Sequence, residues 1–135
     1  CVHRKGATRS FPAGHKDLPE KYLAIGQPVL IPGDMGRYSY VMVGTQTAMD
    51  ETFGSTCHGA GRAKSRKAAK KIIDGKDFLD SLARRGIQVK AGGYSSIAEE
   101  ASIAYKDIEE VIQVAHESGI SRKVARTRPV GVIKG

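Results

Sequence analysis

The residues of this chain best suited to chemistry lie at positions 54–62. This segment reads Gly-Ser-Thr-Cys-His-Gly-Ala-Gly-Arg, so that small residues follow His58. Neutral imidazole has a free nitrogen lone pair near pH 7, so His58 could attack a phosphorus atom and later release the group. Glycines let a backbone approach a ligand closely, which suits a phosphate site. The alternative is a glycine-rich loop that carries a surface histidine.

Cations near this loop could hold phosphate oxygens. Arg62 and Arg66 are four residues apart, and a helix over 63–73 would place both along one edge. Near the N-terminus, Lys5 belongs to a basic segment, Val-His-Arg-Lys-Gly-Ala-Thr-Arg. Phosphate binding is one interpretation of these cations. A basic loop and a solvated basic helix are the alternatives.

A second turn, Pro-Gly-Asp-Met-Gly at 32–36, could hold a nucleotide or simply join two strands. It lacks the Gly-Lys-Ser/Thr end of a phosphate-binding Walker loop, and the sequence contains no Gly-x-Gly-x-x-Gly motif. Metal binding is poorly supported, because Cys1 and His3 are only two potential ligands. Two cysteines in the whole chain also argue against a disulfide-stapled fold.

The net charge of +8 is unevenly distributed. Residues 1–76 carry 13 basic and 6 acidic side chains, residues 77–120 carry 4 and 8, and residues 121–135 carry 5 and none. Two basic ends around an acidic middle suit a polyanionic partner such as RNA. The alternative function is therefore a non-catalytic basic RNA-binding module, although 6% aromatic residues and no Trp disfavour binding by base stacking.

The apolar patterning predicts a mixed α/β (α+β-like) fold with short strands and about three helices. Strands are expected at 27–32, 38–43, 87–91 and 124–134, the last interrupted at Pro129, and helices at 63–73, 77–85 and 104–115. Residues 1–26 are expected to form a loop around at most one short strand, and residues 45–61 a polar loop. Tyr105 would lie on the core side of the last helix.

Composition favours one domain of ordinary size, with 40% hydrophobic and 27% charged residues. The apolar runs are only a few residues long, so we expect no membrane span and a cytoplasmic protein. The chain opens with Cys rather than Met, and its basic start indicates a piece of a longer protein. A leading Cys also remains after intein excision, and trimming would look the same.

Four segments, taken together and in this order, resemble the RtcB family of RNA-splicing ligases. They are the Val-His-Arg-Lys-Gly-Ala-Thr-Arg segment, Ile-Pro-Gly-Asp-Met-Gly, Ser-Thr-Cys-His-Gly-Ala-Gly-Arg with the following Ser65 and Arg66, and Gly-Val-Ile-Lys-Gly at the end. The resemblance implies a GTP- and Mn²⁺-dependent enzyme that joins RNA 2′,3′-cyclic phosphate or 3′-phosphate ends to 5′-hydroxyl ends. The reaction would proceed through a guanylylated histidine.

The resemblance also assigns site residues. His58 would carry GMP, and Lys5, Arg62 and Arg66 would hold the RNA 3′-phosphate or neutralise charge. Lys134 would reach the guanine, and the remaining nucleotide contacts would come from Pro32, Gly33, Asp34, Met35, Ser39, Gly59, Ala60, Gly61 and Tyr105. The family often has Ser at position 34, and a carboxylate beside a phosphate would be repulsive, so only the backbone of Asp34 is expected to contribute.

In the family, the manganese ligands and part of the guanylate pocket lie in a preceding region. The resemblance therefore makes residues 1–135 the C-terminal portion of a larger catalytic domain, with no complete Mn²⁺ site and little or no activity alone. The implied partners are RNA, the N-terminal portion of the same protein and an archease-type activator. The fold should also leave a cleft where that portion packs, with His58 at its edge.

Overall fold

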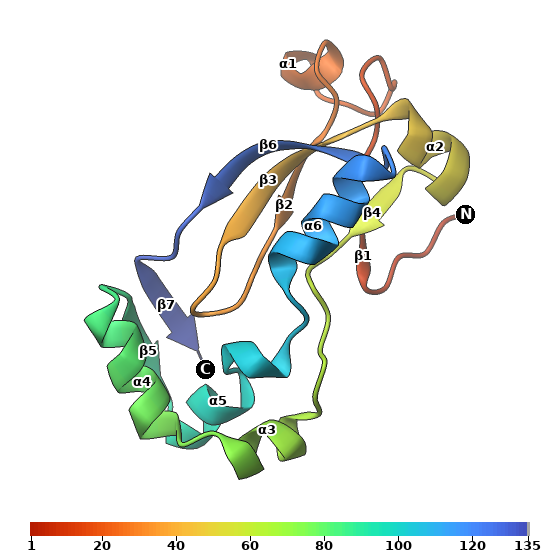
Figure 1. The fold of residues 1–135 in the computed structure, drawn as a ribbon. Coiled ribbons are helices and arrows are strands. Elements are labelled where there is room, and N and C mark those ends of the chain that lie inside the picture. The colour runs from red at the N-terminus through yellow and green to blue at the C-terminus, as the bar shows by residue number, and fades with distance from the viewer. Residues whose placement is uncertain (135) are drawn as a thin grey trace.

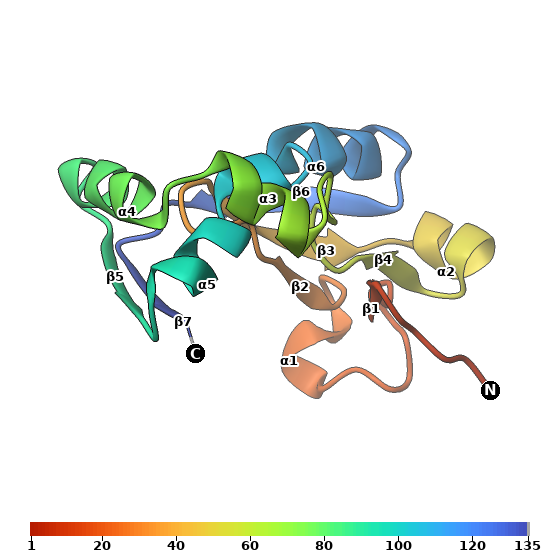
Figure 2. The same cartoon turned by 90° about the horizontal axis from the view of Figure 1, so that it is seen from below.

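The centre of the molecule is a three-stranded antiparallel sheet. The computed structural model describes residues 1–134, and the sheet has the order β2 (Pro28–Ile31), β3 (Ser39–Gly44), β6 (Ser121–Thr127). Helix α6 (Ile108–Glu117) lies on one side of it (Figures 1 and 2). The main core forms between helix and sheet from six buried residues, Val29, Ile31, Tyr40, Met42, Ile108 and Ile112.

The β2–β3 hairpin follows directly from the sequence pattern. Val29 and Ile31 alternate toward the core and pair with Met42 and Tyr40 on the neighbouring strand. Proline and glycine bound the two strands, as expected for residues that punctuate sheets. The hairpin connection at 32–38 therefore projects from the end of the sheet as an irregular loop.

A second pair of strands and two short helices lie at the other end of the sheet (Figure 1). Strand β1 (Ala7–Arg9) pairs antiparallel with β4 (Ser55–Cys57). Helix α1 (Glu20–Leu23) and helix α2 (Gln46–Thr52) complete this end. The side chain of Thr45 caps α2 by accepting a hydrogen bond from the Ala48 amide at 3.2 Å.

The remaining helices form a lobe around a parallel strand pair (Figure 1). This lobe contains α3 (Arg66–Ile72), α4 (Gly75–Arg84), β5 (Gln88–Ala91), α5 (Tyr94–Glu99) and a 3-10 turn (Ser102–Ala104), and β5 pairs with β7 (Gly131–Lys134). Its own core consists of Met35, Leu82, Ile87 and Ile97. Met35 comes from the β2–β3 loop, so the lobe and the sheet are packed together through that loop.

The predicted mixed α/β class is confirmed, but the structure has six α-helices rather than about three. Residues 45–61 are not one polar loop, since they contain α2 and β4. Strand β4 is three residues long and forms through pairing with the distant β1, a signal that local pattern does not carry. The break at Pro129 is confirmed, and it separates β6 and β7 into different sheets.

Tyr105 is not on a helix, contrary to the prediction for 104–115. Helix α6 begins only at Ile108, because the Asp107 carboxylate caps it by accepting from the Glu109 amide at 2.7 Å. Tyr105 itself is extended and half-buried. Among residues 1–134, no helix combines the length and the apolar character that a membrane crossing requires.

Candidate nucleotide site

One cavity brings together the segments that the sequence singled out. Its volume is about 550 Å³, and it lies between the β2–β3 loop, the segment after β4 and the end of β7. It is lined by all eleven residues expected to contact the nucleotide: Pro32, Gly33, Asp34, Met35, Ser39, His58, Gly59, Ala60, Gly61, Tyr105 and Lys134. The expected cleft beside His58 is therefore present.

His58 is placed at the cavity by the short β1–β4 pair. Ala7 lies opposite Cys57, so the chain on either side brings Gly6 and His58 to the same cavity wall. Cys57 packs against the main core and anchors the segment from which His58 projects. The His58 side chain is exposed and makes no hydrogen bond or ion pair with any residue in 1–134. Both ring nitrogens are therefore accessible to a ligand.

The facing wall is a loop whose backbone leaves no room for side chains at Gly33. A β-carbon at Gly33 would lie 1.9 Å from the Tyr38 carbonyl oxygen, a distance that backbone cannot accommodate. The Gly33 amide donates to Ser39 Oγ at 3.1 Å, which fixes that hydroxyl at the cavity. A β-carbon at Gly59 would contact the Pro32 carbonyl oxygen at 3.4 Å, so the two walls approach closely there.

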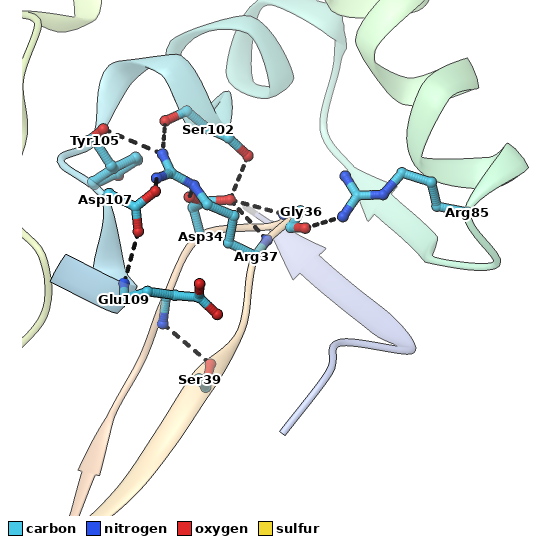
Figure 3. A network of polar contacts seen from close by, with 10 residues as sticks. Asp34, Gly36, Arg37, Ser39, Arg85, Ser102, Tyr105, Asp107 and Glu109 are labelled. Atoms are coloured by element: carbon cyan, nitrogen blue, oxygen red, sulfur yellow. Dashed lines mark hydrogen bonds and ion pairs between the residues drawn. The ribbon is translucent and has the colours of Figure 1, made fainter. Parts of the chain in front are cut away.

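The Asp34 carboxylate is buried in a polar network (Figure 3). Its side chain is 2% exposed and accepts from the Gly36 amide at 2.9 Å, the Arg37 amide at 3.1 Å, Arg37 Nε at 2.7 Å and the Ser102 hydroxyl. The ion pair with the Arg37 guanidinium offsets the negative charge that Asp34 would otherwise present to a bound phosphate.

Arg37 extends this network to the segment that carries Tyr105. Its guanidinium donates to the carbonyl oxygens of Ser102 and Tyr105 and lies 3.4 Å from the Asp107 carboxylate (Figure 3). Gly61 is joined to the same segment, because its carbonyl accepts from the Lys106 amide at 3.0 Å. The contacts of Arg37 and the hydrogen bond from Lys106 to Gly61 therefore fix the segment that carries Tyr105.

Arg62 is engaged by protein groups on every side. Its Nη1 donates to Glu100 Oε1 at 3.2 Å and to the Tyr105 hydroxyl at 3.0 Å, Nη2 donates to the Glu99 carbonyl at 2.5 Å, and Nε donates to the Lys64 carbonyl at 3.0 Å. The guanidinium carbon also lies 4.8 Å from the centre of the Tyr105 ring. Arg62 therefore holds Glu100 and Tyr105, two residues that line the cavity, in fixed positions.

Arg62 and Arg66 do not share a helical edge, contrary to the prediction. Helix α3 begins at Arg66, because the Ser65 hydroxyl caps it, and Arg62 precedes it in an extended segment. The Arg66 side chain is 67% exposed with Nε 3.5 Å from Glu100. Lys5 is exposed and makes no ion pair with residues 1–134. Lys5 and Arg66 do not line the cavity but are open to a ligand that extends from it.

Glu100 is the site residue that the sequence reasoning missed. It lines the cavity, its side chain is 13% exposed, and its Oε2 accepts from Lys134 Nζ at 3.4 Å and from the Tyr105 hydroxyl. Burial opposes ionisation of this carboxyl, but the hydrogen bonds from Tyr105 and Lys134 and the nearby positive charges outweigh it and lower the pKa of Glu100. Glu100 follows α5, a helix that the sequence pattern did not predict, so nothing in the sequence indicated that it belongs to the site.

The lowered pKa of Glu100 has a testable consequence for stability. A carboxyl with a lower pKa in the folded state stabilises the fold when ionised, and this stabilisation is lost as the pH falls through the folded-state value. We expect the difference in unfolding free energy between the wild type and Glu100→Gln to shrink as the pH falls from about 6 to about 3. Urea unfolding across this range measures it, and a difference that is constant with pH would contradict the assignment.

Comparison with known proteins matches the whole chain, residues 1–135, to the family model described as tRNA-splicing ligase RtcB. The chain belongs to the RtcB family. It is 58% identical over 134 residues to the RtcB tRNA-splicing ligase of Thermococcus kodakarensis and 57% identical over 135 residues to that of Archaeoglobus fulgidus. These matches cover 99% and 100% of the chain but 28% of each relative, so the chain spans little more than a quarter of their length.

The cavity lies where the segments of the RtcB-family chain that flank His58 and Lys134 meet. It is lined by the glycine-rich segment around His58, by the β2–β3 loop and by Lys134, whose ammonium contacts Glu100. Manganese is a different matter. Residues 1–134 contain no group of three or more His, Cys, Asp or Glu side chains that could hold a metal ion.

Proposed function

We propose that this chain carries the nucleotide-transferring histidine of an RNA ligase. The longer enzyme would join RNA 2′,3′-cyclic phosphate or 3′-phosphate ends to 5′-hydroxyl ends, as in tRNA splicing and RNA repair, with GTP as co-substrate. One observation carries the proposal: in a chain of the RtcB family, the exposed and unbonded imidazole of His58 faces a cavity of nucleotide size. We also propose that the enzyme acts in the cytoplasm.

Each wall of the cavity would have a different part in holding guanylate. Lys134 would donate to the guanine O6 acceptor, and Tyr105 would lie beside the bound nucleotide. Gly59, Ala60 and Gly61 would surround the GMP with their peptide groups, which glycine exposes. The facing residues would be the loop Pro32, Gly33, Asp34 and Met35 together with Ser39.

The histidine would act first as a nucleophile. One nitrogen of neutral His58 would attack the α-phosphorus of GTP, forming a phosphorus–nitrogen bond as the bond to pyrophosphate breaks. GMP would then pass to the RNA 3′-phosphate, and His58 would regain its lone pair. The 5′-hydroxyl of the second RNA end would attack the activated phosphate and expel GMP. In each of the two GMP transfers one bond to phosphorus forms as another breaks, so no oxidant is needed.

Positive groups near His58 would stabilise the charge that develops in these steps. Lys5 and Arg66 are the accessible cations, and we propose that they hold the RNA 3′-phosphate or neutralise charge during transfer. Arg62 would contribute to the same step indirectly, because its hydrogen bonds hold Glu100 and Tyr105 in the cavity wall. Mn²⁺ would supply Lewis-acid stabilisation of the leaving pyrophosphate, with its ligands in another region of the protein.

An RNA-joining assay with the full-length protein tests the proposal. The substrates are two labelled RNAs, one ending in a 3′-phosphate and the other beginning with a 5′-hydroxyl, incubated with GTP and Mn²⁺. We expect a joined product that depends on GTP and is not obtained with ATP. Salt-sensitive RNA binding without joining would instead support the non-catalytic module. An effect of an archease-type activator is measured in the same assay.

A further inference from the structure

A single carboxylate at the cavity lies where four donors meet. Glu100 follows α5, and its Oε1 faces Arg62 Nη1 at 3.2 Å and Arg66 Nε at 3.5 Å. Its Oε2 faces Lys134 Nζ at 3.4 Å and accepts from the Tyr105 hydroxyl. The two oxygens therefore serve different groups, one the arginines around the start of α3 and the other the groups proposed to contact guanine.

Lys134 depends on this contact for its position. It ends β7, which pairs only with the four-residue strand β5, and within residues 1–134 its ammonium contacts no other acceptor than Glu100. A partly exposed lysine otherwise samples many rotamers, because the side chain has four rotatable bonds and strong hydration. The Glu100 carboxylate selects the rotamers that keep the ammonium inside the cavity.

We propose that Glu100 is the positioning residue for guanine recognition, acting through Lys134. The proposal rests on the proposed function of the cavity. Glu100 itself need not touch any reacting atom. It holds the ammonium where a base with an acceptor at O6 gains a charged hydrogen bond and a base with an amino group there does not. It also offsets the charge of three cations around the pocket.

Replacement by glutamine separates the two sides of this carboxylate. Glutamine has the same size, but only one of its terminal atoms accepts hydrogen bonds. The arginine side has fixed donors, so the amide oxygen is expected to face Arg62 and the NH₂ group to face Lys134. A donor would then meet a donor, and Lys134 would be released while the arginine contact is kept.

Glu99 supplies a matched control on the same turn. Its side chain contacts Lys70 at 2.6 Å and lies 4.0 Å from Arg66, and it does not line the cavity. Glu99→Gln therefore removes the same charge one residue away without touching Lys134 or Tyr105. A general effect of lost negative charge would appear equally in both variants.

The test measures GMP adduct formation on the full-length protein with Mn²⁺ at limiting and at saturating GTP. Glu100→Gln is expected to reduce the adduct about tenfold at limiting GTP, the loss typical of one hydrogen bond to a charged group. Saturating GTP should restore it, whereas Glu99→Gln should match the wild type at both concentrations. ATP should compete better against GTP in Glu100→Gln than in the wild type.

Combination with Lys134→Ala shows whether the effect passes through the lysine. If Glu100 acts by holding Lys134, the double variant should be no weaker than Lys134→Ala alone. Additive losses would overturn the proposal, as would equal adduct formation by Glu100→Gln and wild type at limiting GTP. If Glu100→Gln does not fold, Glu100→Asp, which withdraws the carboxylate by one methylene, is judged by the same criteria. A wild type that forms no adduct overturns the proposed function itself.

Discussion

Replacement of His58 by alanine is expected to abolish GMP transfer to the protein and RNA joining. The substitution removes the only cavity-lining histidine, and loss of a nucleophile typically costs a thousandfold or more, roughly, in rate. Neighbouring Cys57 does not line the cavity, and burial raises the pKa of its thiol, which disfavours the reactive thiolate. The measurement is the intact mass of the full-length protein after incubation with GTP and Mn²⁺.

His116→Ala is the matched control for this experiment. His116 is exposed in the last turn of α6 and does not line the cavity, so the variant should acquire GMP like the wild type. Thermal unfolding of His58→Ala should stay close to the wild type, because the imidazole is exposed and makes no contact that folding requires. An undiminished adduct on His58→Ala would show that another residue is the nucleophile.

Replacement of Lys134 by alanine should weaken guanylylation by about one to two decades at limiting GTP. Loss of a charged hydrogen bond to guanine O6 costs on the order of 1.5–3 kcal/mol, and adenine offers no acceptor at that position. The fold should be kept, since the residue ends a strand at the edge of the lobe. The adduct yield is followed as a function of GTP concentration.

Lys90→Ala provides the comparison for Lys134→Ala. Lys90 lies on the neighbouring strand β5, opposite Ile133, is exposed and does not line the cavity. Its loss should leave the GTP dependence unchanged. Equal guanylylation by Lys134→Ala and the wild type at limiting GTP would refute the assignment of the tail lysine to guanine.

The main hairpin and the composition of the cavity could be predicted from the sequence, for different reasons. Val29 and Ile31 alternate between prolines, which is a local signal of a half-buried strand. The meeting of His58, Ser39 and Lys134 was predicted from the order of four motifs that resemble the RtcB family. Nothing in the spacing alone would have joined segments so far apart in the chain.

What the sequence did not predict depends on pairing and packing at long range. Strand β4 exists through its pairing with β1, and α5 is a six-residue helix that packs on α3 and α4. The position of Arg62 follows from its bridge to Tyr105, which no helical periodicity could indicate. Glu100 became visible as a site residue only when those elements were in place.

Asp34 shows how structure can resolve a doubt raised by the sequence. A carboxylate in a nucleotide loop is unfavourable if it faces the phosphate. Here it accepts hydrogen bonds from Arg37 and Ser102 (Figure 3), so the charge ties the β2–β3 loop to the 3-10 turn that precedes Tyr105. The amides of Gly36 and Arg37 donate to the same carboxylate, which fixes the conformation of the loop.

The central claim, that His58 carries the nucleotide, is tested most directly by locating the adduct. The full-length protein is incubated with GTP and Mn²⁺, digested near neutral pH to preserve a phosphorus–nitrogen bond, and analysed by tandem mass spectrometry. The account predicts GMP on the peptide that contains His58, with fragment ions that place it on the imidazole. GMP on a lysine such as Lys5, or on any other residue while His58 stays unmodified, would contradict it.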